Sequence, residues 1–183
     1  MLDRGQISSD AKKILRRWLC LLESIQARTD PAAVWVYQTW IWRGFNSPAN
    51  LDYLKGWIGA IPPGKALMLD QTAEWTPIWQ KFDNFVFLGV DFIWCTMSTM
   101  GGNVGMYGDI ERLNSGPIDA TNAKNSSMVG VGIDPEGINT NPAYCEQHLS
   151  SHSRVCARLM CAQLCLCVDN DNNVSRALMV CRR

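Results

Sequence analysis

Four short apolar runs, spaced roughly thirty residues apart, limit the folds open to this chain more than any other feature of its sequence. They are rich in β-branched, aromatic, Met and Leu residues, and they span residues 33–40 (AVWVYQTW), 65–70 (KALMLD), 92–97 (FIWCTM) and 127–133 (SMVGVGI). A nearly continuous run of apolar residues is typical of strands that are covered on both faces. The runs therefore predict parallel strands joined by crossover connections, which is an α/β fold.

The spacers between the runs carry helical patterns. Residues 50–61 predict a helix that Pro62-Pro63-Gly64 ends, and residues 76–85 can fill the same role after the second run. Four strand-plus-helix units make half of an eight-fold barrel, and a complete barrel usually needs about 250 residues. We therefore expect a partial (β/α)8 barrel with flanking helices and exposed strand edges.

The composition narrows the possible partners. The 183 residues are 47% apolar, and 17 basic residues balance 17 acidic ones, so nothing in the charge favours nucleic acid or an anionic membrane. No run reaches the roughly 18 uncharged apolar residues of a membrane span. Residues 1–6 carry charges where an export signal needs apolar residues. We expect a globular chain with no nucleic-acid or membrane partner and no export signal, whose strand edges allow self-association.

The sequence divides into three segments. Residues 1–30 predict an amphipathic helix whose basic face is solvated or, alternatively, lies on a membrane surface. Residues 31–146 carry the barrel pattern. Residues 147–183 form a Cys-rich tail that we expect to be helical and then disordered, because no barrel spacing continues there.

Each predicted strand is followed by groups able to bind or react. These are Trp40 after the first strand, Asp70 and Glu74 after the second, Cys95 near the end of the third, and Asp134 and Glu136 after the fourth. In a barrel the C-terminal ends of the strands converge on one face, where the active site is built. Aromatic rings beside carboxylates favour a sugar site, although tryptophans in such a chain are more often core residues.

Glu136 lies between Pro135 and Gly137, directly after a predicted buried strand. This context would hold its carboxylate on a short, stiff turn, and the alternative is a solvated loop acid. Asp70 and Glu74 could equally cap a following helix.

The remaining motifs predict no cofactor. The glycine-rich stretch at 101–105 lacks both the dinucleotide fingerprint and the lysine of a phosphate loop. A metal cluster is conceivable in the tail, but its spacing matches no standard zinc module, so disulfides or buried thiols are favoured there. The residues concerned are His148, His152, Cys156, Cys161, Cys165 and Cys167. The glycosylation triplets at Asn125 and Asn173 matter only on the secretory route.

Four longer motifs carry a family resemblance. They are residues 35–42 (WVYQTWIW), 69–77 (LDQTAEWTP), 92–107 (FIWCTMSTMGGNVGMY) and 128–141 (MVGVGIDPEGINTN). In this order and spacing the chain resembles the alpha-N-acetylglucosaminidases, family 89 of the glycoside hydrolases, over roughly residues 28–146.

The resemblance implies a retaining exo-glycosidase that removes terminal alpha-linked N-acetylglucosamine from a glycan, in animals during the lysosomal breakdown of heparan sulfate. Family members are lysosomal or secreted, need no cofactor, and carry a (β/α)8 barrel whose C-terminal four units match this chain. By motif alignment Glu136 falls on the catalytic nucleophile and Trp40 on a tryptophan of the sugar pocket. Gln71 and Ile93 fall near the same pocket.

The chain also departs from the family pattern. The family's acid/base glutamate lies in an Asn-Glu motif on an earlier strand, and this sequence contains no Asn-Glu pair. Glu74 matches a family glutamate other than the acid/base. At residues 97–103, Met-Ser-Thr-Met-Gly-Gly-Asn replaces Leu-His-Asn-Phe-Gly-Gly-Asn of many relatives. We therefore expect a fragment that is inactive alone or, alternatively, a non-catalytic half-barrel that binds sugar or depends on a partner chain.

Overall fold

The computed structural model describes residues 30–81, 86–97, 108–134, 141, 143–148 and 150, together with residues 17, 20, 21 and 28 and the backbone of Leu178–Val180. The elements in chain order are β1 (Trp35–Gln38), η1 (Thr39–Gly44), α2 (Pro48–Ile58), β2 (Ala66–Asp70), η2 (Val86–Gly89), β3 (Phe92–Thr96), α4 (Ile110–Asn122), β4 (Met128–Ile133) and β5 (Leu178–Val180). Residues 143–148 add a helical segment after β4.

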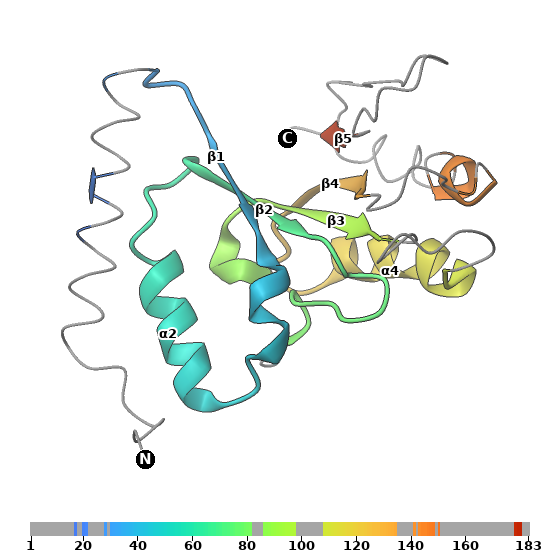
Figure 1. Ribbon diagram of the computed structural model, residues 1–183, viewed down its shortest axis with the longest axis horizontal. Helices are drawn as coiled ribbons and strands as arrows, with labels where there is room; N and C mark the ends of the chain where they lie inside the picture. Colours follow the sequence, from blue (N-terminus) through green and yellow to red (C-terminus); the bar gives the residue numbers. More distant parts are fainter. Residues whose placement is uncertain are drawn as a thin grey trace.

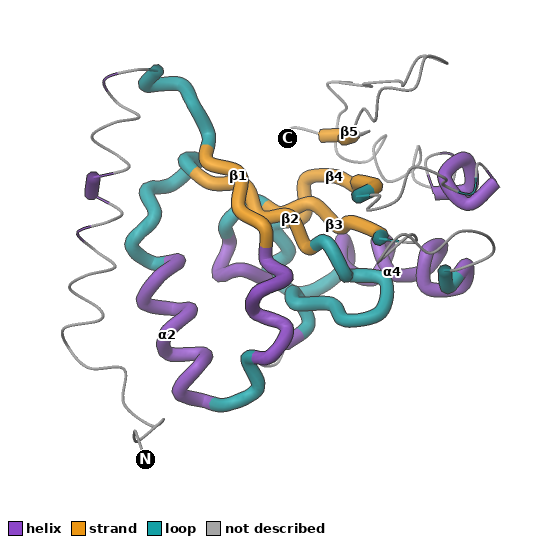
Figure 2. Tube along the Cα trace, viewed as in Figure 1, coloured by secondary structure: helices purple, strands orange, loops and turns teal. Residues whose placement is uncertain are grey.

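The strands of the described residues form one sheet in the order β1-β2-β3-β4-β5 (Figures 1 and 2). The first three pairings are parallel, and β5 runs antiparallel to β4. Spatial order therefore equals sequence order from β1 to β4, as in successive strands of a (β/α)8 barrel. The predicted α/β fold and its parallel strands are confirmed. The short β5 at the end of the chain was not predicted.

The first strand is shorter than its apolar run predicts, because the chain turns into η1 at Thr39. The Thr39 hydroxyl donates to the Leu69 carbonyl at 2.9 Å and fastens this turn to β2. The predicted helix at 50–61 is observed as α2, two residues earlier, because Ser47 caps it and Pro48 occupies its first turn. Residues 76–80 of the predicted second helix lie in turns.

One face of the sheet is covered by α2, η1 and α4 and carries the main core (Figure 1). Alternate strand residues point into it, among them Met68, Phe92 and Trp94, which have essentially no exposed surface. Burying a side chain of this size is worth about 1.5–3 kcal/mol. Helix α4 reaches Trp94 at Gly116, where an added Cβ would lie 2.6 Å from the indole ring.

The opposite face carries a smaller apolar cluster of Ile93, Cys95 and Val129, with Leu67 and Leu69 packed against it. On β1 the same face leaves Val36 48% exposed. In a barrel this would be the interior face, which the remaining strands close.

Helix α4 was not predicted from the sequence, because Gly116 and Pro117 lie within it. Its start carries a recognisable signal, since the Asp109 side chain accepts a hydrogen bond from the Arg112 N–H at 3.0 Å.

The predicted N-terminal helix is observed only where the structure describes it, at residues 17, 20, 21 and 28, which are all helical. Within the described residues, no helix combines the length and the apolar character needed to cross a membrane.

Candidate active site

The C-terminal ends of β1 to β4 gather polar side chains at one edge of the sheet. Thr39 follows β1, residues 70–74 end and follow β2, Thr96 ends β3, and Asp134 follows β4. Parallel strands in this order present their C-terminal ends side by side, which is the edge where barrel enzymes build active sites. Most of these side chains are buried and engage one another.

Asp70, the last residue of β2, is fully buried. One carboxylate oxygen accepts the backbone N–H groups of Ile78 (2.9 Å) and Trp79 (3.0 Å). The other oxygen has no hydrogen-bond partner among the described residues. Burial raises the pKa of Asp70 from 3.8 to about 7, against the lowering effect of the two N–H donors. Asp70 therefore holds the turn at residues 78–81 in place, rather than capping a following helix as one of its two predicted roles required.

Gln71 is 4% exposed, and its side-chain amide donates a hydrogen bond to the Asp134 carboxylate. The NH₂ end of Gln71 faces Asp134, since it is the nitrogen that donates to the carboxylate oxygen. The Gln71 carbonyl oxygen is buried and has no partner within the described part of the chain. The structure thus brings the loop after β2 against the residue that precedes Pro135 and Glu136.

Glu74, on the same loop, is 2% exposed and joins three other segments. One oxygen accepts the Thr96 hydroxyl, and the other accepts the Asp109 backbone N–H at 2.9 Å. The Thr96 hydroxyl also lies 2.7 Å from the Tyr144 hydroxyl. Burial raises the pKa of Tyr144 well above its usual range, and Glu74 adds to this rise. Thr96 and Tyr144 were not predicted as site residues, because the contacts that join them are distant in sequence.

The two apolar residues predicted for the sugar pocket lie in different surroundings. Trp40, in η1, is 52% exposed. Ile93 is fully buried, with Cys95 and Val129 on the face opposite the helices. The Cys95 thiol is buried too, and burial, followed by the charges of Asp134 and Asp70, raises its pKa well above the ordinary value. Cys95 is therefore a thiol rather than a nucleophilic thiolate.

Several predicted features lie outside the described residues. They include Glu136, the glycine-rich stretch at 101–105, and all of the tail cluster except His148. His148 is fully buried, with its ring against Trp94 and one ring nitrogen 3.2 Å from the Gly132 carbonyl. No group of three or more metal-ligating side chains occurs in the described part of the chain.

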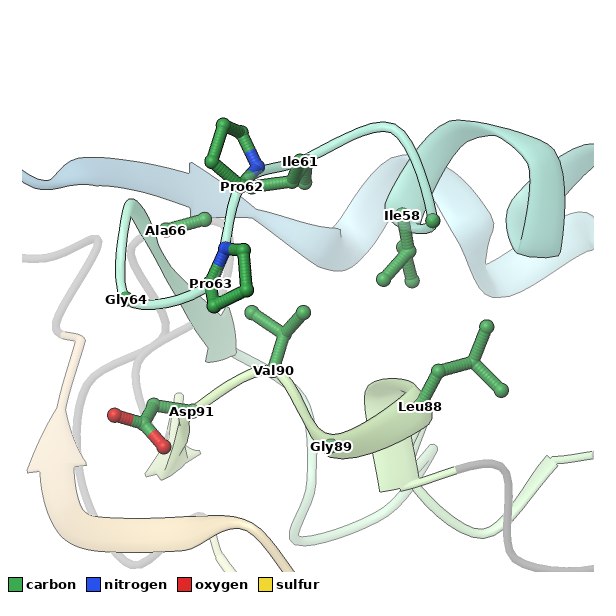
Figure 3. A pocket seen from close by; sticks show the side chains of 11 residues that line it. Ile58, Ile61, Pro62, Pro63, Gly64, Ala66, Leu88, Gly89, Val90 and Asp91 are labelled. Carbon is green, nitrogen blue, oxygen red and sulfur yellow. The ribbon is translucent and has the colours of Figure 1, made fainter.

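An open apolar hollow of about 260 Å³ lies away from this edge (Figure 3). It is lined by Ile58, Pro63, Leu88 and Val90, beside the residues that begin β2 and precede β3. It therefore belongs to the N-terminal ends of the strands, where barrels serve stability rather than catalysis.

The parallel sheet in sequential order, with its helices on one face, defines part of a (β/α)8 barrel, and its C-terminal edge gathers buried carboxylates. The chain belongs to the family described as the alpha-N-acetylglucosaminidase (NAGLU) tim-barrel domain, which it matches over residues 6–152.

Known relatives agree with this assignment. Human alpha-N-acetylglucosaminidase is 36% identical over 137 residues, which are 73% of this chain and 18% of the human protein. A family 89 glycoside hydrolase from Clostridium perfringens, solved with 2-acetamido-1,2-dideoxynojirimycin, gives a TM-score of 0.57 at 26% identity, over 76% of this chain and 14% of that one. The same enzyme with two glutamates changed to glutamine, bound to its substrate GlcNAc-alpha-1,4-galactose, gives 0.56 at 27% identity and equal coverage. The chain thus spans less than a fifth of the relatives it matches.

Proposed function

We propose that this chain carries the nucleophile side of a retaining alpha-N-acetylglucosaminidase site, with Glu136 as the nucleophile. The observation that carries the proposal is the family match over residues 6–152, within which the sequence Pro135-Glu136-Gly137 comes directly after Asp134, the residue that follows β4. The substrate would be a glycan with terminal alpha-linked N-acetylglucosamine. The Clostridium enzyme binds such a sugar, and its substrate complex holds two glutamate-to-glutamine changes.

Retaining hydrolysis uses two carboxyl groups about 5–5.5 Å apart, one attacking the anomeric carbon and one protonating the leaving oxygen. The buried carboxylates of the described edge are committed elsewhere: Asp70 holds two backbone N–H groups, and Glu74 holds Thr96 and Asp109. We therefore do not assign the proton donor to either of them. Since the sequence has no Asn-Glu pair, we infer that this polypeptide alone lacks the acid/base and is inactive or nearly so.

The proposed sugar contacts follow from exposure and bonding. Trp40 presents a half-exposed indole face on which an apolar sugar face can pack. Gln71 would accept a hydrogen bond through its unpaired carbonyl oxygen, since its NH₂ is held by Asp134. Ile93 is fully buried with Cys95 and Val129, so it would support the pocket wall from behind rather than touch the sugar. The biological setting that we propose is glycosaminoglycan breakdown of the heparan sulfate type, in the lysosome or outside the cell.

Two measurements on the 183-residue chain test these proposals. In a single-turnover assay with an activated alpha-N-acetylglucosaminide, we expect no hydrolysis above that of Glu136→Gln, and Glu136-dependent hydrolysis would overturn the inactivity. In an NMR titration with 2-acetamido-1,2-dideoxynojirimycin, we expect weak binding that Trp40→Ala abolishes. Binding that is unaffected by Trp40→Ala would remove Trp40 from the site.

A second candidate is a non-catalytic half-barrel that binds sugar or pairs through its sheet. The half-exposed Val36 on the less covered face, with β1 at the end of the described sheet, favours it. Sedimentation or light scattering on the purified chain distinguishes the candidates. A soluble oligomer of defined size supports the half-barrel, and polydisperse aggregation supports a fragment that needs the rest of a barrel.

A further inference from the structure

The carboxylate of Glu74 is the meeting point of four segments that are far apart in sequence. Glu74 itself lies on the loop after β2, Thr96 ends β3, Asp109 precedes α4, and Tyr144 lies in the helical segment after β4. All four meet at the C-terminal edge of the sheet. Burying a carboxylate is costly unless it is fully hydrogen-bonded, so this arrangement needs a reason beyond filling space.

The hydrogen bonds of Glu74 hold two separate branches of the fold, one at Asp109 and one at Thr96 and Tyr144. Its first oxygen accepts the Asp109 N–H, and its second accepts the only hydrogen of the Thr96 hydroxyl. The Tyr144 hydroxyl lies 2.7 Å from the Thr96 hydroxyl and also hydrogen-bonds with the Glu74 side chain. Because both Glu74 oxygens accept hydrogen bonds, the one side chain stabilises both branches.

The same junction is closed by direct packing. Gly108, with φ of +131°, lies so close to Tyr144 that an added Cβ would be 2.4 Å from its ring. The backbone before α4 therefore contacts Tyr144 and, one residue later, donates to Glu74. A side chain at position 108 would separate the two branches.

Two connections end at this junction. One runs from Thr96 to Asp109, and the other runs from β4 to Tyr144 and contains Glu136. The near end of the second connection is also bonded, since Asp134 donates its N–H to the Thr96 carbonyl at 2.9 Å and accepts from Gln71. The loop after β2 thus contacts both described ends of the stretch in which Glu136 lies.

We propose that Glu74 is a positioning residue of this active site, whose buried carboxylate anchors the start of α4 and the segment that carries Tyr144 to the end of β3. This inference rests on the proposed function, because what it positions is the sugar site at that edge. It assigns Glu74 no contact with substrate and no proton transfer.

The test is amide hydrogen exchange measured by NMR on the full chain and its variants. Glu74→Leu removes the acceptor, and exchange at Asp109 and Tyr144 should accelerate about tenfold or more, as expected when a buried donor loses its partner. Glu74→Gln keeps an acceptor for Asp109 and a donor for Thr96, so it should rescue both amides. Thr96→Val should loosen Tyr144 alone, because Asp109 keeps its bond to Glu74.

Ser127→Ala is the matched control. It also removes side-chain hydrogen bonds to two backbone carbonyls, at Val86 and Val90, near the start of β4. It should leave Asp109 and Tyr144 protected. Unchanged exchange in Glu74→Leu, failure of Glu74→Gln to rescue, or equal loosening in Ser127→Ala would each overturn the anchoring. If Glu74→Leu does not fold, the contrast between Glu74→Gln and Thr96→Val decides the question.

Titration with 2-acetamido-1,2-dideoxynojirimycin distinguishes failure of the positioning role of Glu74 from failure of the proposed sugar site. We expect Glu74→Leu to weaken binding about tenfold or more and Glu74→Gln to restore it. Binding that depends on Trp40 but ignores Glu74→Leu would overturn positioning and leave the proposed function standing. If the wild-type chain does not bind the iminosugar, the proposed sugar site of the isolated chain fails, and exchange alone decides the anchoring role.

Discussion

Replacing Asp70 with asparagine should remove a large part of the pH dependence of this chain's stability. Asp70 is fully buried, and its pKa is raised from 3.8 to about 7 in the folded chain. Between these values the folded state holds a proton that the unfolded state has released. The stabilisation is therefore complete below pH of about 4 and is lost as the pH rises to about 7.

The size of the effect follows from the shift. About three pKa units, at 1.36 kcal/mol each, give roughly 4 kcal/mol, with a slope near 1.4 kcal/mol per pH unit. Natural domains have free energies of unfolding of about 5–15 kcal/mol, so a change of this size is measurable. The asparagine side chain of the Asp70→Asn variant would stay neutral, and its carbonyl oxygen could still accept the N–H groups of Ile78 and Trp79. The free energies of unfolding of wild type and Asp70→Asn should thus move relative to each other by roughly 4 kcal/mol between pH of about 4 and about 7. Any pH-independent effect of the substitution only shifts one curve by a constant amount.

The assay is urea unfolding followed by tryptophan fluorescence at a series of pH values from about 4 to about 8, which covers the window between the two pKa values. Asp52→Asn, on the exposed face of α2, is the matched control and should run parallel to wild type. A constant difference between wild type and Asp70→Asn would refute the reasoning. So would a variant that loses stability relative to wild type as the pH rises.

Three further predictions concern packing, capping and the site. Gly116→Ala should lower the free energy of unfolding by about 1–3 kcal/mol, because its Cβ would lie 2.6 Å from the Trp94 ring. Gly56→Ala, in the middle of α2 where no atom is near, should raise it by up to about 1 kcal/mol. Equal effects of the two variants in denaturant unfolding would contradict the close contact between α4 and β3. Ser47→Ala should cost about 1 kcal/mol by removing the cap of α2, and the loss should show in the same unfolding assay. Trp40→Ala should abolish iminosugar binding and leave the melting temperature unchanged, since the side chain is 52% exposed. A large drop in the melting temperature would mark Trp40 as a core residue.

The strands could be predicted from the sequence because each is a short apolar run with a clear boundary. Pro62-Pro63-Gly64 separates α2 from β2, and β2 begins within one residue of its predicted start. The end of β1 could not be predicted, because the turn at Thr39 depends on a hydrogen bond to Leu69, thirty residues away. Helix α4 was missed because local rules treat Gly116-Pro117 as a break, while contact with β3 favours a glycine there.

The residues of the candidate site could be predicted only where a carboxylate side chain ends or closely follows a strand. Asp70, Glu74 and Asp134 were identified because they follow apolar runs, and their common edge follows from parallel strand order. Their partners were not predictable. In the sequence Thr96 belongs to an apolar strand, and Tyr144 lies near the end of the barrel segment with no role assigned to it. Their link to Glu74 appears only when the segments are packed together.

The central claim is that Glu136 is the nucleophile of an alpha-N-acetylglucosaminidase site, and a chimera tests it most directly. Residues 31–146 would replace the aligned segment of human alpha-N-acetylglucosaminidase, which then supplies the rest of the barrel. We predict hydrolysis of an activated alpha-N-acetylglucosaminide that Glu136→Gln lowers by roughly a thousandfold or more, while Glu146→Gln, an exposed control, leaves it unchanged. A folded, iminosugar-binding chimera that is inactive, or whose kcat is the same with and without Glu136, would contradict the claim.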